Sequence, residues 1–164
     1  MQKTLESAWV NRSNKLPIKT IDELLILASI VEKETAVESE RGLVASVFAN
    51  RLVKRMKLQT DPTVIYAITM GKHDLGRSLK KKDLSIDSPY NTYKYYGLPP
   101  SPICNPGRLS IEAAANPQKS SYLYFVADGK GGHNFSKSLK EHNTNVQNWL
   151  KERKEKKKLS KKSN

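Results

Sequence analysis

The hydrophobic pattern between residues 20 and 34 predicts a buried helix. Apolar residues recur at helical spacing along Ile-Asp-Glu-Leu-Leu-Ile-Leu-Ala-Ser-Ile-Val, and Thr20 and Glu23 match a capping box at its start. At roughly 100° per residue, Glu34 falls over Leu27, whereas Glu32 points to the opposite side of the helix. We therefore expect Glu32 to face water and Glu34 to face the core.

An acid among apolar neighbours is a candidate catalytic group. Its charged form loses hydration, so its pKa rises and the group can stay protonated near neutral pH as a general acid. Acids near helix ends also often lie on the rim of a core and reach water, and periodicity alone favours that ordinary interpretation. The pattern therefore nominates Glu34 without assigning its role.

The next segments of the chain predict a second helix and a long irregular stretch. A second amphipathic helix is expected from Ser39 to Lys54, and the two helices should pack as a helical hairpin. From Met56 to Pro106 prolines interrupt any regular pattern, except for a helix expected from Pro62 to Met70. Long ordered loops of this kind often carry function.

The C-terminal third predicts a short helix and a β-hairpin. Ser110 is placed to cap a helix that continues through Ala115. The run 122–127 is typical of a strand, residues 128–132 supply a glycine-rich turn, and His133-Asn-Phe-Ser returns as the partner strand. The expected fold class is therefore mixed α+β.

Chain length and composition favour one compact domain. A chain of 164 residues with 37% hydrophobic residues can bury one sizeable core. We expect a connector at residues 1–19, with Leu5, Ala8 and Trp9 available for docking and a short helix at its start. The catalytic or binding domain should span residues 20–150, followed by a basic tail at 151–164.

The net charge of +13 is concentrated toward the C-terminus. The tail has eight Lys or Arg against Glu152 and Glu155, a net of +6, which leaves +7 on the rest of the chain. A helix should begin near residues 142–145, and beyond Leu150 the absence of apolar periodicity predicts a solvated or disordered tail. Such basicity suits any polyanion as well as a plain solvated surface, so it does not indicate nucleic acid.

Several kinds of site find no support in the sequence. Cys104 is the only cysteine, which excludes an intramolecular disulfide and a multi-cysteine metal site, and it is expected to be a passive side chain. There is no phosphate-binding loop, no paired histidines for zinc and no nucleophile elbow, so no cofactor or metal is expected. No run approaches the roughly 20 apolar residues that span a bilayer, so the chain as given is expected to be soluble.

Three further groups are candidates for ligand binding, and each also has an ordinary structural interpretation. Asp61 precedes a proline helix start and could simply cap the first turn. Tyr90 and Tyr93 flank amide and hydroxyl groups, which suits sugar rings but also a core edge. His133 and Phe135 share one face of a strand beside a glycine-rich turn, where a lone histidine is more often structural.

The motifs of this chain, taken in their order, closely resemble those of the MltG (YceG-like) family of endolytic murein transglycosylases. The similarity covers roughly residues 20–150. It is carried by Leu27-Ala-Ser-Ile-Val-Glu-Lys-Glu-Thr-Ala, Arg51-Leu, Leu58-Gln-Thr-Asp-Pro-Thr-Val-Ile-Tyr, Tyr90-Asn-Thr-Tyr, Gly97-Leu-Pro-Pro, Asn105-Pro-Gly and the segment 122–135. Cys104 departs locally from the pattern, since a small residue is expected there.

The resemblance implies a catalytic domain related to the lysozyme-like fold, with Glu34 as the single essential acid. It implies cleavage of the MurNAc-GlcNAc β-1,4 bond inside peptidoglycan strands, leaving a 1,6-anhydroMurNAc end, as a step in cell-wall assembly and strand termination. The expected groove residues are Gln59, Asp61, Tyr66, Tyr90, Asn91, Thr92, Tyr93, Asn105, His133 and Phe135. Glu38 and Asp61 are weak candidates for a second acid.

The family's full-length proteins begin with a transmembrane helix and a smaller LysM-like domain. The resemblance therefore predicts that this chain is the C-terminal catalytic portion, as an expressed fragment or an incomplete gene product. It places the full-length proteins at the periplasmic face of the cytoplasmic (inner) membrane, with peptidoglycan synthases such as penicillin-binding proteins as expected neighbours. Two alternatives stay open: a water-using muramidase with a second carboxylate, and a non-catalytic module that binds polyanions or glycans.

Overall fold

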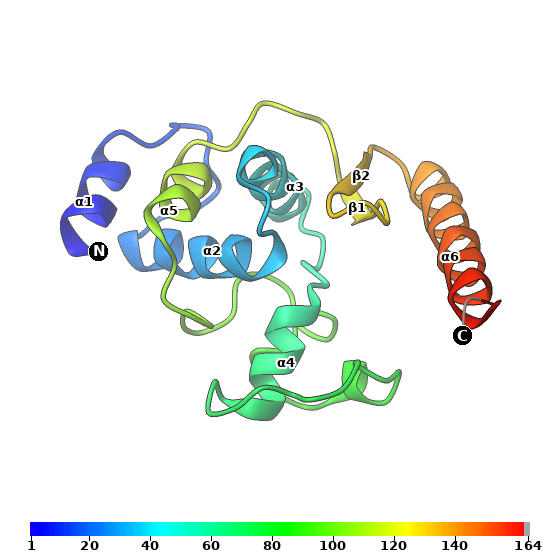
Figure 1. Ribbon diagram of the computed structural model, residues 1–164. Coiled ribbons are helices and arrows are strands. Elements are labelled where there is room, and N and C mark those ends of the chain that lie inside the picture. Colours follow the sequence, from blue (N-terminus) through cyan, green and yellow to red (C-terminus); the bar gives the residue numbers. More distant parts are fainter. Residues whose placement is uncertain (163–164) are drawn as a thin grey trace.

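Helices make up most of the regular secondary structure, and a two-stranded hairpin separates the helical body from the last helix (Figure 1). The computed structural model describes the backbone of residues 1–162 and the side chains of residues 1–155. Its elements are α1 (Gln2–Val10), α2 (Ile21–Glu34), the 3-10 helix η1 (Glu38–Glu40), α3 (Arg41–Val53), α4 (Asp61–Thr69), the 3-10 helix η2 (Asp83–Ser85), α5 (Arg108–Ala115), β1 (Tyr124–Ala127), β2 (His133–Ser136) and α6 (Leu139–Lys162). The predicted mixed α+β class is confirmed.

Helix α2 is the centre of the core and contacts α1, α3, α4 and α5. Thr20 caps it, since its hydroxyl accepts a hydrogen bond from the Glu23 amide at 3.2 Å. The side chains of Leu24, Leu27 and Ile30 are fully buried, and burial of each contributes about 1.5–3 kcal/mol. This helix therefore fixes the position of whatever its last residue, Glu34, carries.

The N-terminal connector folds onto this body. It forms α1, which packs on α5 and α2, with Ala8 buried and Leu5 and Trp9 partly buried against the core. The Ser13 amide donates a hydrogen bond to the Ala115 carbonyl at 3.0 Å. Residues 1–19 thus share the hydrophobic core of the rest of the chain.

The two helices predicted to pack as a helical hairpin, α2 and α3, are in contact, but they cross each other (Figure 1). In Figure 1, α2 runs across the view and α3 is seen nearly end-on. The turn between them includes η1, so α2 ends at Glu34 and does not continue toward Glu38. Glu38 is exposed, which removes the helical geometry that would have aligned it with Glu34.

Glu32 does not simply face water as the pattern predicts. Its carboxylate accepts hydrogen bonds from the Gly107 amide at 3.1 Å and from the Ser110 hydroxyl at 2.5 Å. These contacts lower the pKa of Glu32, with the Ser110 bond as the largest cause. They place a carboxylate at the N-terminus of α5, where free amides favour negative charge. Ser110 itself lies inside the first turn of α5 and is not its cap.

The hairpin and α6 form the side of the molecule opposite α1. The antiparallel strands pair Phe125 with Phe135 and Ala127 with His133. Helix α6 packs on both strands and begins at Leu139, slightly earlier than the sequence predicts. The tail was expected to be solvated or disordered: its backbone is helical to Lys162 and not disordered, and its described side chains at 151–155 are exposed, as expected of a solvated tail. Residues 163 and 164 of that tail lie outside the described residues. Lysine, arginine and glutamate are good helix formers, so a helix can continue without apolar periodicity.

Across residues 1–162, none of the helices combines the length and the apolar character needed to cross a membrane.

Candidate active site

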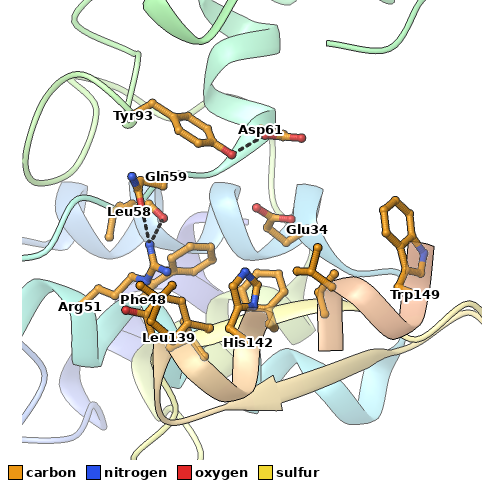
Figure 2. Close-up of a pocket in the computed structure, with 15 residues that line it drawn as sticks. Glu34, Phe48, Arg51, Leu58, Gln59, Asp61, Tyr93, Leu139, His142 and Trp149 are labelled. Atoms are coloured by element: carbon orange, nitrogen blue, oxygen red, sulfur yellow. Dashed lines mark hydrogen bonds between the residues drawn. The ribbon is translucent and has the colours of Figure 1, made fainter. Parts of the chain in front are cut away.

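A cavity of about 500 Å³ separates the helical body from α6 and contains the carboxyl group of Glu34 (Figure 2). The residues that line it are Glu34, Val47, Phe48, Arg51, Leu58, Gln59, Asp61, Tyr93, Tyr124, Phe125, Val126, Leu139, His142, Val146 and Trp149. Most of this wall is apolar or aromatic, and few polar groups converge on it. That composition is typical of ligand-binding cavities.

Glu34 occupies the last position of α2 and reaches the cavity from the core side. Its pKa is raised from 4.5 to about 7. Burial is the main cause; the hydroxyl of Thr60, which donates a hydrogen bond to Oε1, opposes it, and the nearby charge of Asp61 raises the pKa further. A carboxyl group with such a pKa can give up a proton and take one back near neutral pH.

Asp61 lies beside Glu34 but does not cap α4. Thr60 is the N-cap residue, Asp61 is the first residue of the helix, and Pro62 follows it. The Asp61 carboxylate instead accepts a hydrogen bond from the Tyr93 hydroxyl at 2.6 Å. Burial and this bond raise the pKa of Tyr93, so the phenol stays protonated as the donor. The cavity therefore contains two carboxyl groups in different environments.

Arg51 closes one end of the cavity from α3. The residue is 7% exposed, and its guanidinium donates to the carbonyls of Leu123 at 2.7 Å and of Lys57 and Leu58 at 3.0 Å each. It also lies over the Tyr124 ring, 5.0 Å from the centroid. One buried cation thus joins α3, the loop before α4 and the start of the hairpin.

Gln59, Asp61 and Tyr93 are the predicted groove residues that the structure brings together with Glu34. Gln59 has a φ of 51°, in the left-handed region that is uncommon for a residue other than glycine. The backbone amide of Gln59 donates to the Thr92 carbonyl at 3.1 Å. Strained backbone of this kind is often found at functional sites.

Asn91 and Thr92 support the cavity and do not line it. Asn91 is fully buried, and its side-chain amide donates to the carbonyls of Leu84 and Ile86 at 3.0 and 2.9 Å. The Thr92 hydroxyl accepts from the Thr60 amide at 3.1 Å. These two predicted groove residues hold the loop that positions Thr60, because their polar atoms are occupied by the protein itself.

Tyr66, Tyr90, Asn105 and Phe135 also lie outside the lining of this cavity. Tyr66 and Tyr90 pack on each other with ring centroids 4.8 Å apart, and Tyr66 faces a separate cavity beside α4. Asn105 is exposed before α5. Phe135 packs against the core and contacts the ring of Tyr122. Their expected contact with the ligand therefore finds no support in the geometry.

His133 is near Glu34 without lining the cavity. Its Nδ1 is 2.7 Å from Glu40 Oε2, and its backbone amide donates to Glu40 Oε1 at 2.9 Å. The ring packs edge-on against Phe125, with centroids 5.3 Å apart. The pairing with Glu40 orients the imidazole. The electrostatic effect of His133 acts to lower the pKa of Glu34.

Sequence reasoning missed Arg51, Tyr124, His142 and Trp149 as lining residues. Arg51 could have been found, because it interrupts the apolar side of a predicted helix. His142, Val146 and Trp149 follow helical spacing within 142–150, but nothing in the pattern shows which part of the fold that stripe faces.

Metal binding and a cysteine nucleophile are two other chemistries that the structure bears on. Among the side chains described, those of residues 1–155, no group of three or more His, Cys, Asp or Glu is arranged to hold a metal ion. The Cys104 thiol donates to the Ser29 carbonyl at 3.3 Å, and burial raises its pKa. Both features make it a poor nucleophile.

Comparison with known proteins places these features in a family. Residues 1–148 match the YceG-like family model. The endolytic murein transglycosylase of Bacillus subtilis (strain 168) is 50% identical over 137 residues, which are 84% of this chain and 37% of that protein. The endolytic murein transglycosylase of Streptococcus pneumoniae serotype 2 (strain D39 / NCTC 7466) is 44% identical over 131 residues, which are 77% of this chain and 23% of that protein.

A solved structure agrees with these matches. The crystal structure of a yceG-like protein from Listeria monocytogenes has a TM-score of 0.70 and 52% sequence identity, covering 76% of this chain and 39% of that one. The chain thus spans well under half the length of each of these relatives. The match over most of the chain and the shared fold give one conclusion: this chain belongs to the YceG-like family.

Proposed function

We propose that this chain is the catalytic part of an endolytic peptidoglycan lytic transglycosylase, built on a lysozyme-like helical body, and that Glu34 is its acid and base. The observation that carries the proposal is a carboxyl group in a largely apolar cavity with a pKa of about 7. The names of the relatives support the reaction class. The substrate is then the MurNAc-GlcNAc β-1,4 bond inside a glycan strand, and the reaction serves strand termination during cell-wall assembly.

In the first step, protonated Glu34 gives its proton to the oxygen between the two sugars. The bond from this oxygen to the anomeric carbon of MurNAc breaks, and the GlcNAc leaves as an alcohol. The anomeric carbon develops oxocarbenium character. Asp61 supplies a carboxylate in the same cavity, held by a hydrogen bond from Tyr93. The negative charge of this carboxylate favours the positive charge that develops on the anomeric carbon.

In the second step, Glu34 acts as a carboxylate. It takes the proton from the 6-hydroxyl of the same MurNAc, and the oxygen of that hydroxyl bonds to the anomeric carbon. The product is a 1,6-anhydro end, Glu34 is protonated again, and no water is consumed. A pKa near 7 suits a group that must exist in both protonation states during one turnover.

A water-using muramidase is the second candidate, because Asp61 places another carboxyl group in the cavity. Glu38 does not support this alternative, since it is exposed and does not line the cavity. The test is borohydride reduction of fragments released from purified glycan strands, followed by mass spectrometry. Anhydro ends resist reduction, which is the expected result; fragments that gain two hydrogens have reducing ends and would establish the muramidase.

The groups around Glu34 predict opposite shifts in the pH dependence of cleavage. The first step needs protonated Glu34, so activity should fall as pH rises through about 7. Replacing Asp61 by Asn removes a charge that raises the pKa of Glu34, so this fall should move to lower pH. Replacing Thr60 by Val removes a hydrogen bond that lowers the same pKa, so the fall should move to higher pH. The measurement is kcat/KM against pH, which reports the free enzyme.

Asp74→Asn is the matched control for these profiles, because Asp74 is an exposed acid that lines a separate cavity. Its profile should coincide with that of the parent chain. Shifts of the same sign in the Asp61 and Thr60 variants would contradict the assignment of Glu34 as the acid.

Location and partners follow only from the resemblance. We propose that the longer protein acts at the periplasmic face of the cytoplasmic membrane, close to peptidoglycan synthases that extend the same strands.

A further inference from the structure

One whole wall of the Glu34 cavity comes from α6. Its lining residues, Leu139, His142, Val146 and Trp149, recur at helical spacing and form one stripe on the helix. Figure 2 shows Trp149 at one end of the cavity and Arg51 with Gln59 at the other, while His142 lies across from Glu34. The catalytic carboxyl group therefore lies between the helical body and this stripe.

The stripe is held in place from behind. The imidazole of His142 stacks on the ring of Tyr124 with centroids 5.1 Å apart and an interplanar angle of 24°. The Asn145 side chain donates to the Ser136 hydroxyl at 3.0 Å. Helix α6 therefore packs on the hairpin, and the cavity separates its stripe from α2 and α3.

The Nδ1 atom of the His142 imidazole is shielded from water and has no hydrogen-bond partner among the described residues. A buried polar atom without a partner costs free energy, so such atoms are rare in folded proteins. Burial and the positive charge of Arg51 lower the pKa of His142, which favours the neutral form of the ring. A neutral imidazole can both donate and accept, as hydroxyl and acetamido groups require.

Trp149 supplies the flat apolar surface that complements this polar group. Its indole lines the cavity two turns beyond His142, and the Arg153 guanidinium lies 5.3 Å from the ring centroid. A large aromatic face beside a few hydrogen-bonding groups is the composition expected of a site for a pyranose ring. The family match ends at residue 148, one residue before Trp149.

We propose that α6 forms half of a sugar-binding subsite, in which Trp149 stacks on an N-acetylhexosamine unit next to the cleaved bond and His142 hydrogen-bonds its hydroxyl or acetamido group. The occupant is one sugar of a glycan strand, so the inference rests on the proposed function. The stripe then determines how a strand is aligned against Glu34, and the contribution of α6 is to binding and not to proton transfer.

The test measures binding separately from cleavage. The chain has two tryptophans, so Trp9→Phe leaves Trp149 as the only indole. Trp9 lies on α1, on the side of the molecule opposite the hairpin and α6 (Figure 1). In a Trp9→Phe, Glu34→Gln background, peptide-free glycan strands are titrated while tryptophan fluorescence is recorded. The emission should change with saturation, because the sugar replaces water at the indole.

Calorimetric titration of the same strands then compares variants in the Glu34→Gln background. Trp149→Ala should weaken binding about tenfold, a loss of the size expected for one aromatic contact. His142→Gln should weaken binding several-fold, and Trp149→Phe should recover most of the affinity. Leu150→Ala is the matched control, since Leu150 is an exposed neighbour on α6 that does not line the cavity. In chains that keep Glu34, the same substitutions should raise KM more than they lower kcat.

The outcomes separate this subsite from the reaction. Unchanged Trp149 emission, together with parental affinity in Trp149→Ala and His142→Gln, overturns the subsite even if the chain makes anhydro ends. Binding that depends on Trp149 in a chain that makes no anhydro ends supports the subsite and removes the proposed reaction. If Trp149→Ala loses its helical circular dichroism, Trp149→Phe and His142→Gln decide the question on folded protein.

Discussion

Replacing Glu34 by Gln should lower the rate of strand cleavage by about a thousandfold or more. The amide keeps the shape of the side chain and can still accept a hydrogen bond from Thr60, but it can neither give up nor take back a proton. General acid and base catalysis each contribute roughly 10²–10⁴ in rate, and Glu34 is assigned both steps. The measurement is the initial rate of fragment release from purified strands at neutral pH.

The same variant should be well folded, and at alkaline pH more stable than the parent. Glu34 has a pKa of about 7 in the folded chain against an ordinary value of 4.5, so the folded state holds this proton more tightly than the unfolded state. The parent therefore loses stability as pH rises from about 4.5 to 7, by up to about 3 kcal/mol. Glutamine stays neutral and avoids this loss.

Glu38→Gln is the control for charge, since it removes an acid four residues further along the chain that is exposed and outside the cavity. It should cleave at the parental rate. A Glu34→Gln chain that is folded by circular dichroism and retains more than a tenth of the parental rate would remove Glu34 from the mechanism.

Arg51→Met should cost about 3 kcal/mol of unfolding free energy. Arg51 is 7% exposed, and its guanidinium donates to three backbone carbonyls, those of Leu123, Lys57 and Leu58. Methionine fills a similar volume but removes the guanidinium donor from all three carbonyls. The hydrogen bond to Leu58 is buried and the other two are partly buried, so each loss carries a desolvation cost. Arg51→Lys should recover only part of the loss, because an ammonium group cannot reproduce the planar fork of donors.

Urea unfolding at neutral pH measures this loss, with Arg55→Met as the control. Arg55 lies four residues after Arg51, just beyond the end of α3, and it is exposed. Its substitution should change stability by less than about 0.5 kcal/mol. Equal stabilities for the Arg51 and Arg55 variants would show that the buried cation does not join the cavity wall together.

Sequence patterns with short-range causes were enough to predict most elements of the fold. The α2 helix, the α4 helix and the hairpin follow from apolar spacing, proline placement and a glycine-rich turn. The errors arose where distant parts of the chain meet. Glu32 was expected to face water, but its partners Gly107 and Ser110 lie at the start of α5, about 75 residues away in the sequence.

In the candidate site too, residues placed by local helix geometry could be predicted, and residues placed by contacts between distant segments could not. Glu34 could be nominated from periodicity because a helix determines which way its residues point. Asn91 and Thr92 were expected in the groove because amides and hydroxyls suit sugars, whereas their atoms are occupied by neighbouring backbone groups. His142 and Trp149 could not be assigned, because only the packing of α6 on the hairpin places them opposite Glu34.

The most direct test of the central claim follows oxygen from the solvent during cleavage. Peptide-free glycan strands are incubated with the parent chain or with Glu34→Gln in water enriched in heavy oxygen, and the new ends are analysed by mass spectrometry. The mechanism predicts that the parent alone releases internal fragments with 1,6-anhydroMurNAc ends and no heavy oxygen. Ends that contain one heavy oxygen, or equal cleavage by the two chains, would contradict Glu34 as the single acid and base of a reaction without water.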